Sequence, residues 1–241
     1  MSEKGNQAVK TVSFMMLITL FGKILGMVRE QLLAANYGTD MQAAAFLLAS
    51  RIPRTFFDVI FASAISASFI PVFVEYLQKK GRQEAFSLAN RFITMISTVT
   101  LLMMLLGMAF AKPLTLLIAP GYDVETVTLC VGLLRMLFPT MLFTAVAFSF
   151  VGILQSLEEF NVPAALSVVS NGVLILYYIF FNEKFGILGL TVAFLIGWAM
   201  QAVIQIPSLW KKGYHYHPDF HFKDEGLRKI GKLMLPVMVS T

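Results

Sequence analysis

Five basic side chains lie within stretches of sequence that are apolar enough to cross a lipid bilayer: Lys23, Arg29, Arg51, Arg54 and Arg135. Only two acids, Glu30 and Asp58, lie at a similar depth, and five minus two leaves three unpaired positive charges. A charged side chain in hydrocarbon costs roughly 2.5–3.5 kcal/mol on insertion scales, so it faces a wet cavity or a partner. We therefore interpret the surplus as the lining of a cavity that receives an anion.

The residue types indicate which anion such a cavity suits. The planar guanidinium of arginine donates paired hydrogen bonds to phosphate oxygens, and lysine adds a compact point charge. Several cations grouped in mid-membrane favour a phosphate or pyrophosphate group over a neutral compound. The alternative, that a long side chain bends to the headgroup region, stays open for Arg29, which lies near the outer end of its predicted helix. It also stays open for Arg135, if its long predicted helix begins above the bilayer.

The spacing of these charges predicts how they share helix faces. Lys23 and Glu30 are seven residues apart, which places them within about 20° of one face. Arg54 and Asp58 have the i, i+4 spacing of an intrahelical ion pair. Arg29 and Glu30 are sequence neighbours, and we expect that they do not face each other.

The composition is that of an all-α integral membrane protein. Hydrophobic residues make up 57% of the 241 residues and charged residues only 14%, whereas soluble domains carry about 25% charged residues. The mean hydropathy is +0.74, and the continuous apolar runs are about 20 residues long, which suits membrane-spanning helices. The single Cys130 excludes an internal disulfide.

Six membrane-spanning helices are predicted, over residues 9–35, 41–79, 85–111, 124–157, 163–181 and 185–210. Pro53 and Pro139 are the expected bends in the two longest segments. A polar loop covers 211–225, and a last helix begins near Gly226 but is too short to span the bilayer. We therefore expect a six-helix lobe at 1–225 and the truncated start of a second lobe at 226–241.

Loop charges predict the orientation in the membrane. With a cytoplasmic N-terminus, twelve Lys and Arg residues lie in cytoplasmic segments, and only Lys112 and Lys184 lie outside. This bias follows the positive-inside rule. It also accounts for the sequence pI of about 9.3 without a nucleic-acid partner.

Motifs for other chemistry are weak or missing. His215, His217 and His221 lie in the predicted polar loop, and this spacing is too weak a signal to assign a metal site. The sequence has no glycine-rich nucleotide loop, zinc-protease helix or serine nucleophile elbow, so we expect neither an enzyme nor a cofactor. Asn171 is an intramembrane amide, a type that more often forms interhelical hydrogen bonds than binds ligands.

A series of short motifs runs through the chain. In sequence order they are FGKILGMVRE at 21–30, Gly38, RIP at 51–53, FIPVF at 69–73, APGY at 119–122, LLRMLFP at 133–139, Gly152 with Gln155, FNVPA at 160–164, and Asn171. In their order and spacing, over nearly the whole chain, these motifs resemble the lipid II flippases of the MurJ/MviN family.

The resemblance implies one of the two six-helix lobes of a MOP/MATE-like exporter. Such a protein lies in the bacterial cytoplasmic membrane and moves lipid II, or a related undecaprenyl-pyrophosphate-linked lipid, to the outer leaflet by alternating access. Its partners would be that lipid, the membrane lipids and the missing C-terminal lobe. The family's cation site lies in the second lobe, so the resemblance assigns no coupling ion to this chain.

The family's functional positions are only partly matched. Its basic residues in the first helix fall on Lys23, where arginine is commoner, and on Arg29, and its acid falls on Glu30. In the second helix a family acid falls on Ala44 and a basic pair on Phe57 and Asp58, whereas Arg54 stands where asparagine is frequent. Compared with the family pattern, the basic charge of the second helix is thus displaced by about one helical turn.

The leading hypothesis is a lipid II flippase that binds the pyrophosphate in a cationic cavity. The expected substrate-binding residues are Lys23, Arg29, Arg51 and Arg54, with Glu30 and Asp58 as charge partners and Arg135 as a further candidate. The alternatives are an exporter of another polyprenyl-linked glycan or amphipathic compound, and a non-transporting membrane scaffold.

Overall fold

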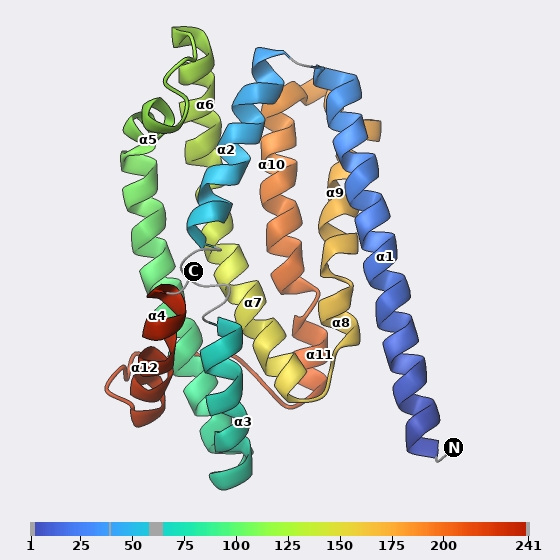
Figure 1. Cartoon of the computed structure of the whole chain (residues 1–241), viewed down its shortest axis with the longest axis vertical. Coiled ribbons are helices and arrows are strands. Elements are labelled where there is room, and N and C mark those ends of the chain that lie inside the picture. Colours follow the sequence, from blue (N-terminus) through green and yellow to red (C-terminus); the bar gives the residue numbers. More distant parts are fainter. Residues whose placement is uncertain (1–2, 39, 58–64, 240–241) are drawn as a thin grey trace.

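The computed structural model describes residues 3–38, 40–57 and 65–239, and within these ranges it contains helices and no β-strand. Figure 1 shows a bundle of long helices with shorter helices at both ends. The elements are α1 (Glu3–Tyr37), α2 (Met41–Phe57), η2 (Ile65–Phe69), α3 (Ile70–Lys79), α4 (Arg82–Ala109), α5 (Ala111–Ile118), α6 (Val124–Leu137), α7 (Thr140–Ser156), α8 (Asn161–Ala164), α9 (Leu166–Phe180), α10 (Asn182–Val203), α11 (Ile206–Lys211) and α12 (Glu225–Val239).

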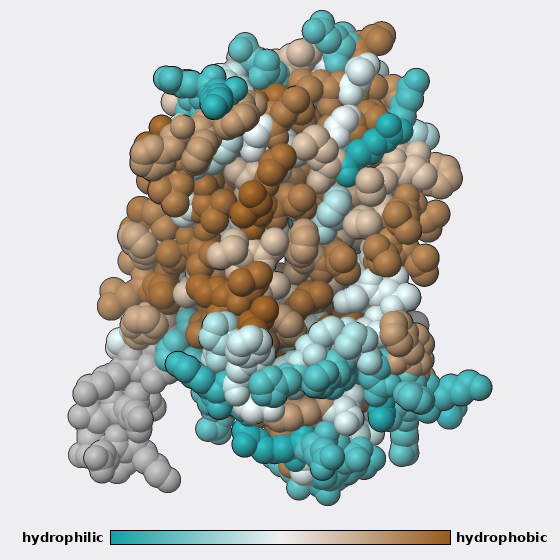
Figure 2. Space-filling model, turned by 180° about the vertical axis from the view of Figure 1, so that it is seen from behind, coloured by the Kyte–Doolittle hydropathy of each residue, from teal (hydrophilic) through white to brown (hydrophobic). Residues whose placement is uncertain are grey.

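The described helices include five that are long and apolar enough to cross a membrane: Val12–Tyr37, Arg82–Ala109, Val124–Ser156, Asn161–Phe180 and Asn182–Lys211. Figure 2 shows a broad hydrophobic belt between two polar ends, as a bilayer requires. The prediction of an all-α, multi-pass membrane protein is therefore confirmed. The remaining predicted segment, 41–79, consists of α2, η2 and α3, and its residues 58–64 lie outside the described ranges.

Breaks between helices fall where the backbone chemistry requires them. Pro139 precedes α7 and divides the predicted segment 124–157 into α6 and α7, because proline cannot donate the helical hydrogen bond. Gly38 follows α1 with a positive φ of 55°, a conformation that glycine adopts without strain. Pro53, the other expected bend, lies inside α2, and the helix continues beyond it to Phe57.

Helix packing produces two hydrophobic cores. One joins α3, α4 and α7 around aromatic side chains, with the rings of Phe69 and Phe92 stacked 4.4 Å apart. The other surrounds Leu133, Leu134 and Leu137 of α6, which contact α2 and α10. Helix α1 lies at the edge of the bundle and packs mainly on α9 (Figure 1).

Arg91 of α4 forms ion pairs with the loop at 212–224, between α11 and α12. Its Nε donates to Asp219 at 2.9 Å and its Nη1 donates to Asp224 at 2.6 Å. The other oxygen of Asp224 accepts from the backbone N–H groups of Gly226 and Leu227 at 2.8 and 3.1 Å, so this carboxylate caps the start of α12. One guanidinium thus ties both the loop and α12 to α4.

Replacing Arg91 should destabilise this end of the molecule. Arg91→Met removes two charged hydrogen bonds and leaves two carboxylates without their cation, for a loss of roughly 2–4 kcal/mol. Thermal melting of the purified protein in detergent should show a lower midpoint. Arg228→Met, which changes an exposed arginine on α12, is the control, and equal midpoints for the two variants would contradict the role of Arg91.

Acid should weaken the same attachment. The pKa of Asp219 is lowered to about 2, first because the backbone N–H and ring of His221 donate to it, and also because Arg91 lies beside it. The contribution of the Asp219 carboxylate to the stability of the folded protein is therefore present above its ordinary pKa of 3.8. This contribution is lost as the pH falls toward 2. Between about pH 5 and pH 2.5, the melting temperature of the wild type should fall more steeply than that of Asp219→Asn; parallel curves would contradict this.

Candidate binding site

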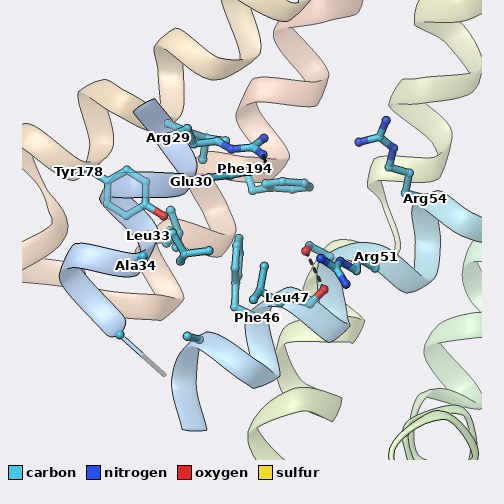
Figure 3. A pocket seen from close by; sticks show the side chains of 15 residues that line it. Arg29, Glu30, Leu33, Ala34, Phe46, Leu47, Arg51, Arg54, Tyr178 and Phe194 are labelled. Atoms are coloured by element: carbon cyan, nitrogen blue, oxygen red, sulfur yellow. Dashed lines mark hydrogen bonds and ion pairs between the residues drawn. The ribbon is translucent and has the colours of Figure 1, made fainter. Parts of the chain in front are cut away.

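A cavity of about 390 Å³ opens between α1 and α2, with α9 and α10 behind it (Figure 3). Three arginines and one acid line it: Arg29, Arg51, Arg54 and Glu30. Large apolar side chains complete the wall: Phe46 and Leu47 from α2, Tyr178 from α9, and Leu190 and Phe194 from α10. The cavity therefore combines basic groups with an aromatic and aliphatic wall.

The helix arrangement brings these arginines together from distant parts of the sequence. The turn at Gly38 returns the chain so that α2 begins beside the end of α1, and the two helices then diverge (Figure 1). The space between them holds Arg29 from α1 and Arg51 from α2. Arg51 and Arg54 are three residues apart, so both lie on one side of α2, and Figure 3 shows both guanidinium groups beside the cavity.

Arg29 is held by partners on two helices. Its Nη1 donates to Asn171 Oδ1 of α9 at 3.3 Å, and its Nη2 donates to Glu30 Oε1 at 3.1 Å. The prediction that Arg29 and Glu30 do not face each other is wrong, because their side chains form an ion pair. Glu30 has 72% of its side chain exposed and Arg29 has 31%, so solvent screens this pair.

The described residues that line the cavity carry more positive than negative groups. Among the described lining residues three arginines face one acid, and three minus one leaves a net charge of +2. Arg51 and Arg54 are both exposed in this structure. Asp58, the predicted partner of Arg54, lies outside the described residues. The structure thus brings Arg29, Arg51 and Arg54 to one cavity.

The structure does not bring Lys23 or Arg135 into this cavity. Lys23 lies six residues before Arg29, which turns it by about 120° around α1 and moves it about 9 Å along the axis. It lies in a separate surface groove that other α1 side chains, such as Met16 and Leu20, also line. Arg135 is exposed, and its Nε donates to the carbonyl of Met108 at the end of α4, at 3.2 Å.

Comparison with known proteins identifies the family. The family described as "Lipid II flippase MurJ" matches residues 33–241. The "Probable lipid II flippase MurJ" of Buchnera aphidicola subsp. Acyrthosiphon pisum is 31% identical over 228 residues, which cover 93% of this chain and 45% of that protein. The chain thus spans about half the length of the curated relatives it matches.

Solved structures with the same fold are membrane transporters. "Lipid II flippase MurJ, inward closed conformation" superposes with a TM-score of 0.76 at 25% identity, over 94% of this chain and 48% of that one. The Vibrio cholerae MATE transporter VcmN superposes with a TM-score of 0.76 at 16% identity, over 98% of this chain and 54% of its own.

The fold is the one that this MurJ structure shares with MATE transporters of the MOP superfamily, and the chain covers about half of each. Within that class, the chain belongs to the lipid II flippase MurJ family.

The arginines that line the cavity should make a cysteine introduced there react faster with an anionic reagent than with a cationic one. A cysteine introduced by Ser50→Cys would lie in the cavity lining, where the arginines raise the local concentration of anions. Thr128→Cys is a matched control, because Thr128 lies in a groove with Glu125 and, like Ser50, bonds a carbonyl of its own helix.

The measurement is the ratio of labelling rates with an anionic and a cationic thiosulfonate. We expect this ratio to be about tenfold or more higher at position 50 than at position 128, and to shrink at high salt. Equal ratios at the two positions would mean that the cavity exerts no net positive field. The native Cys130 is buried, which limits background labelling.

Proposed function

We propose that the protein moves lipid II across the bacterial cytoplasmic membrane, and that Arg29, Arg51 and Arg54 bind its pyrophosphate. The observation that carries this proposal is the grouping of three arginines with one acid among the described residues that line a single cavity of an apolar helix bundle. Membership of the MurJ family supports the choice of substrate. The transfer makes and breaks no covalent bond, so the protein needs no catalytic group.

The chemistry of the cavity supports a pyrophosphate-bearing lipid. Guanidinium groups donate to phosphate oxygens in pairs, and their charge remains fixed at any physiological pH. The negative group would offset the cost of three cations at membrane depth. The aromatic side chains of Phe46, Tyr178 and Phe194 in the cavity wall would contact the less polar parts of the lipid substrate.

Movement across the membrane requires a second half of the transporter. We propose that residues 1–225 form the first lobe, that α12 begins the second, and that the two lobes alternate in exposing the cavity to each side. The N-terminus would be cytoplasmic, because the predicted cytoplasmic segments carry twelve basic residues and the outer segments two. Arg91 would then tie the two lobes at the cytoplasmic surface.

The test is lipid II translocation by the protein at its natural length, reconstituted in vesicles. Arg29→Gln, Arg51→Gln and Arg54→Gln should each slow translocation by about tenfold or more, since each removes a charged hydrogen-bond donor from the pyrophosphate. Arg51→Lys should give a smaller loss, because it keeps the charge and loses the paired geometry.

Arg135→Gln is the matched control. It removes an arginine of similar predicted depth that lies outside the cavity, and we expect translocation within about twofold of the wild type. If Arg135→Gln and the three cavity variants lose activity equally, the cavity is not the substrate site. If the cavity variants all remain active, the pyrophosphate assignment is wrong.

A further inference from the structure

Asn171 is the buried polar group that links the cavity to the helix behind it. The residue is 8% exposed and lies in α9. Its Oδ1 accepts from Arg29 at 3.3 Å, and its Nδ2 donates to the carbonyl of Gly22 at 3.1 Å. Both partners belong to α1, two turns apart. A single side chain therefore holds both the backbone of α1 and one cavity arginine.

These two contacts fix the orientation of the amide. The Gly22 carbonyl can only accept a hydrogen bond and the Arg29 guanidinium can only donate one. The amide therefore has to turn its nitrogen to Gly22 and its oxygen to Arg29. The close approach of the helices holds it there, because a Cβ added at Gly26 would lie 3.4 Å from Nδ2 and one at Gly22 would lie 2.2 Å from Ser167 Oγ.

The amide leaves Arg29 available to a ligand. Asn171 and Glu30 each occupy one N–H group of the guanidinium, and five minus two leaves three N–H groups. Asn171 is neutral, so it holds the guanidinium without cancelling its charge. A carboxylate at the same position would still accept from Arg29, but it would add one negative charge beside the described lining of the cavity and would lose the donor to Gly22.

We propose that Asn171 is the positioning residue for Arg29, and that a neutral amide is required there so that the arginine is held but remains charged toward an anionic ligand. This inference rests on the proposed function, because the ligand is taken to be a pyrophosphate. It assigns Asn171 no contact with that ligand.

The first experiment tests the hydrogen bond between Asn171 and Arg29 in the absence of a ligand. Phenylglyoxal modifies arginine side chains, and mass spectrometry of the protein at its natural length gives the rate at Arg29. Asn171→Leu should raise that rate about threefold to tenfold, the factor that one hydrogen bond supplies. The rate at Arg135 is the internal control. Ser170→Ala, which changes a hydroxyl bonded only to its own helix, should leave both rates unchanged.

The second experiment tests the requirement for neutrality, with inorganic pyrophosphate as the probe. Asn171→Asp should weaken pyrophosphate binding about tenfold or more, because it adds a negative charge beside Arg29. Adding Glu30→Gln removes one negative charge, which restores the wild-type charge balance, and should recover binding to within about threefold of the wild type. The same Glu30→Gln change should not rescue Asn171→Leu, in which the position of Arg29 is lost.

The outcomes separate the inference from the proposed function. An unchanged rate of Arg29 modification in Asn171→Leu overturns the positioning role. A failure of Glu30→Gln to restore pyrophosphate binding in Asn171→Asp overturns it as well, because the effect of a merely structural residue would not depend on a charge removed at position 30. If Asn171→Asp does not accumulate as folded protein, the modification rates decide alone. If the wild type fails to bind pyrophosphate while the modification rates change as expected, the proposed function and the requirement for a neutral residue are overturned. The hydrogen bond by which Asn171 positions Arg29 then still stands.

Discussion

The cost of a cation in hydrocarbon governs this structure. A guanidinium at membrane depth needs water, a partner or a ligand, and the fold meets that need differently at each basic residue. Arg135 donates to a backbone carbonyl at a helix end. Arg29 is held by an amide and an exposed acid. Arg51 and Arg54 face the same cavity as Arg29. The three arginines that meet at this cavity are the groups by which, under the function proposed above, it would recognise an anionic headgroup.

The rest of the bundle serves to keep these arginines on one cavity. Helix α1 lies at the edge of the structure and is held by the close contact of its glycines with α9, where Asn171 adds the polar bond. Helix α2 is set by the turn at Gly38 and by its packing on α6. Since each helix is anchored to a different neighbour, a relative movement of α1 and α2 would change the distance between Arg29 and Arg51. Such a change would suit the binding and release of a ligand in the alternating-access mechanism proposed above.

Much of the fold could be predicted from the sequence because it depends on local chemistry. Length and apolarity identify the long helices, and the missing N–H of Pro139 locates the break between α6 and α7. The grouping of arginines could be predicted only in part. Lys23 and Arg29 share a helix, but the face that each presents to the cavity depends on how α2 returns beside α1, which is a tertiary property. The bond from Asn171 to Arg29 joins residues 142 positions apart, and no spacing rule predicts it.

The most direct test of the account is a structure of the protein at its natural length with a short-chain polyprenyl pyrophosphate bound. The account predicts density for the two phosphates between Arg29, Arg51 and Arg54, with Arg29 still bonded to Asn171. Density for the phosphates elsewhere, or a cavity in which all three guanidinium groups are paired with carboxylates while the lipid is bound, would contradict it.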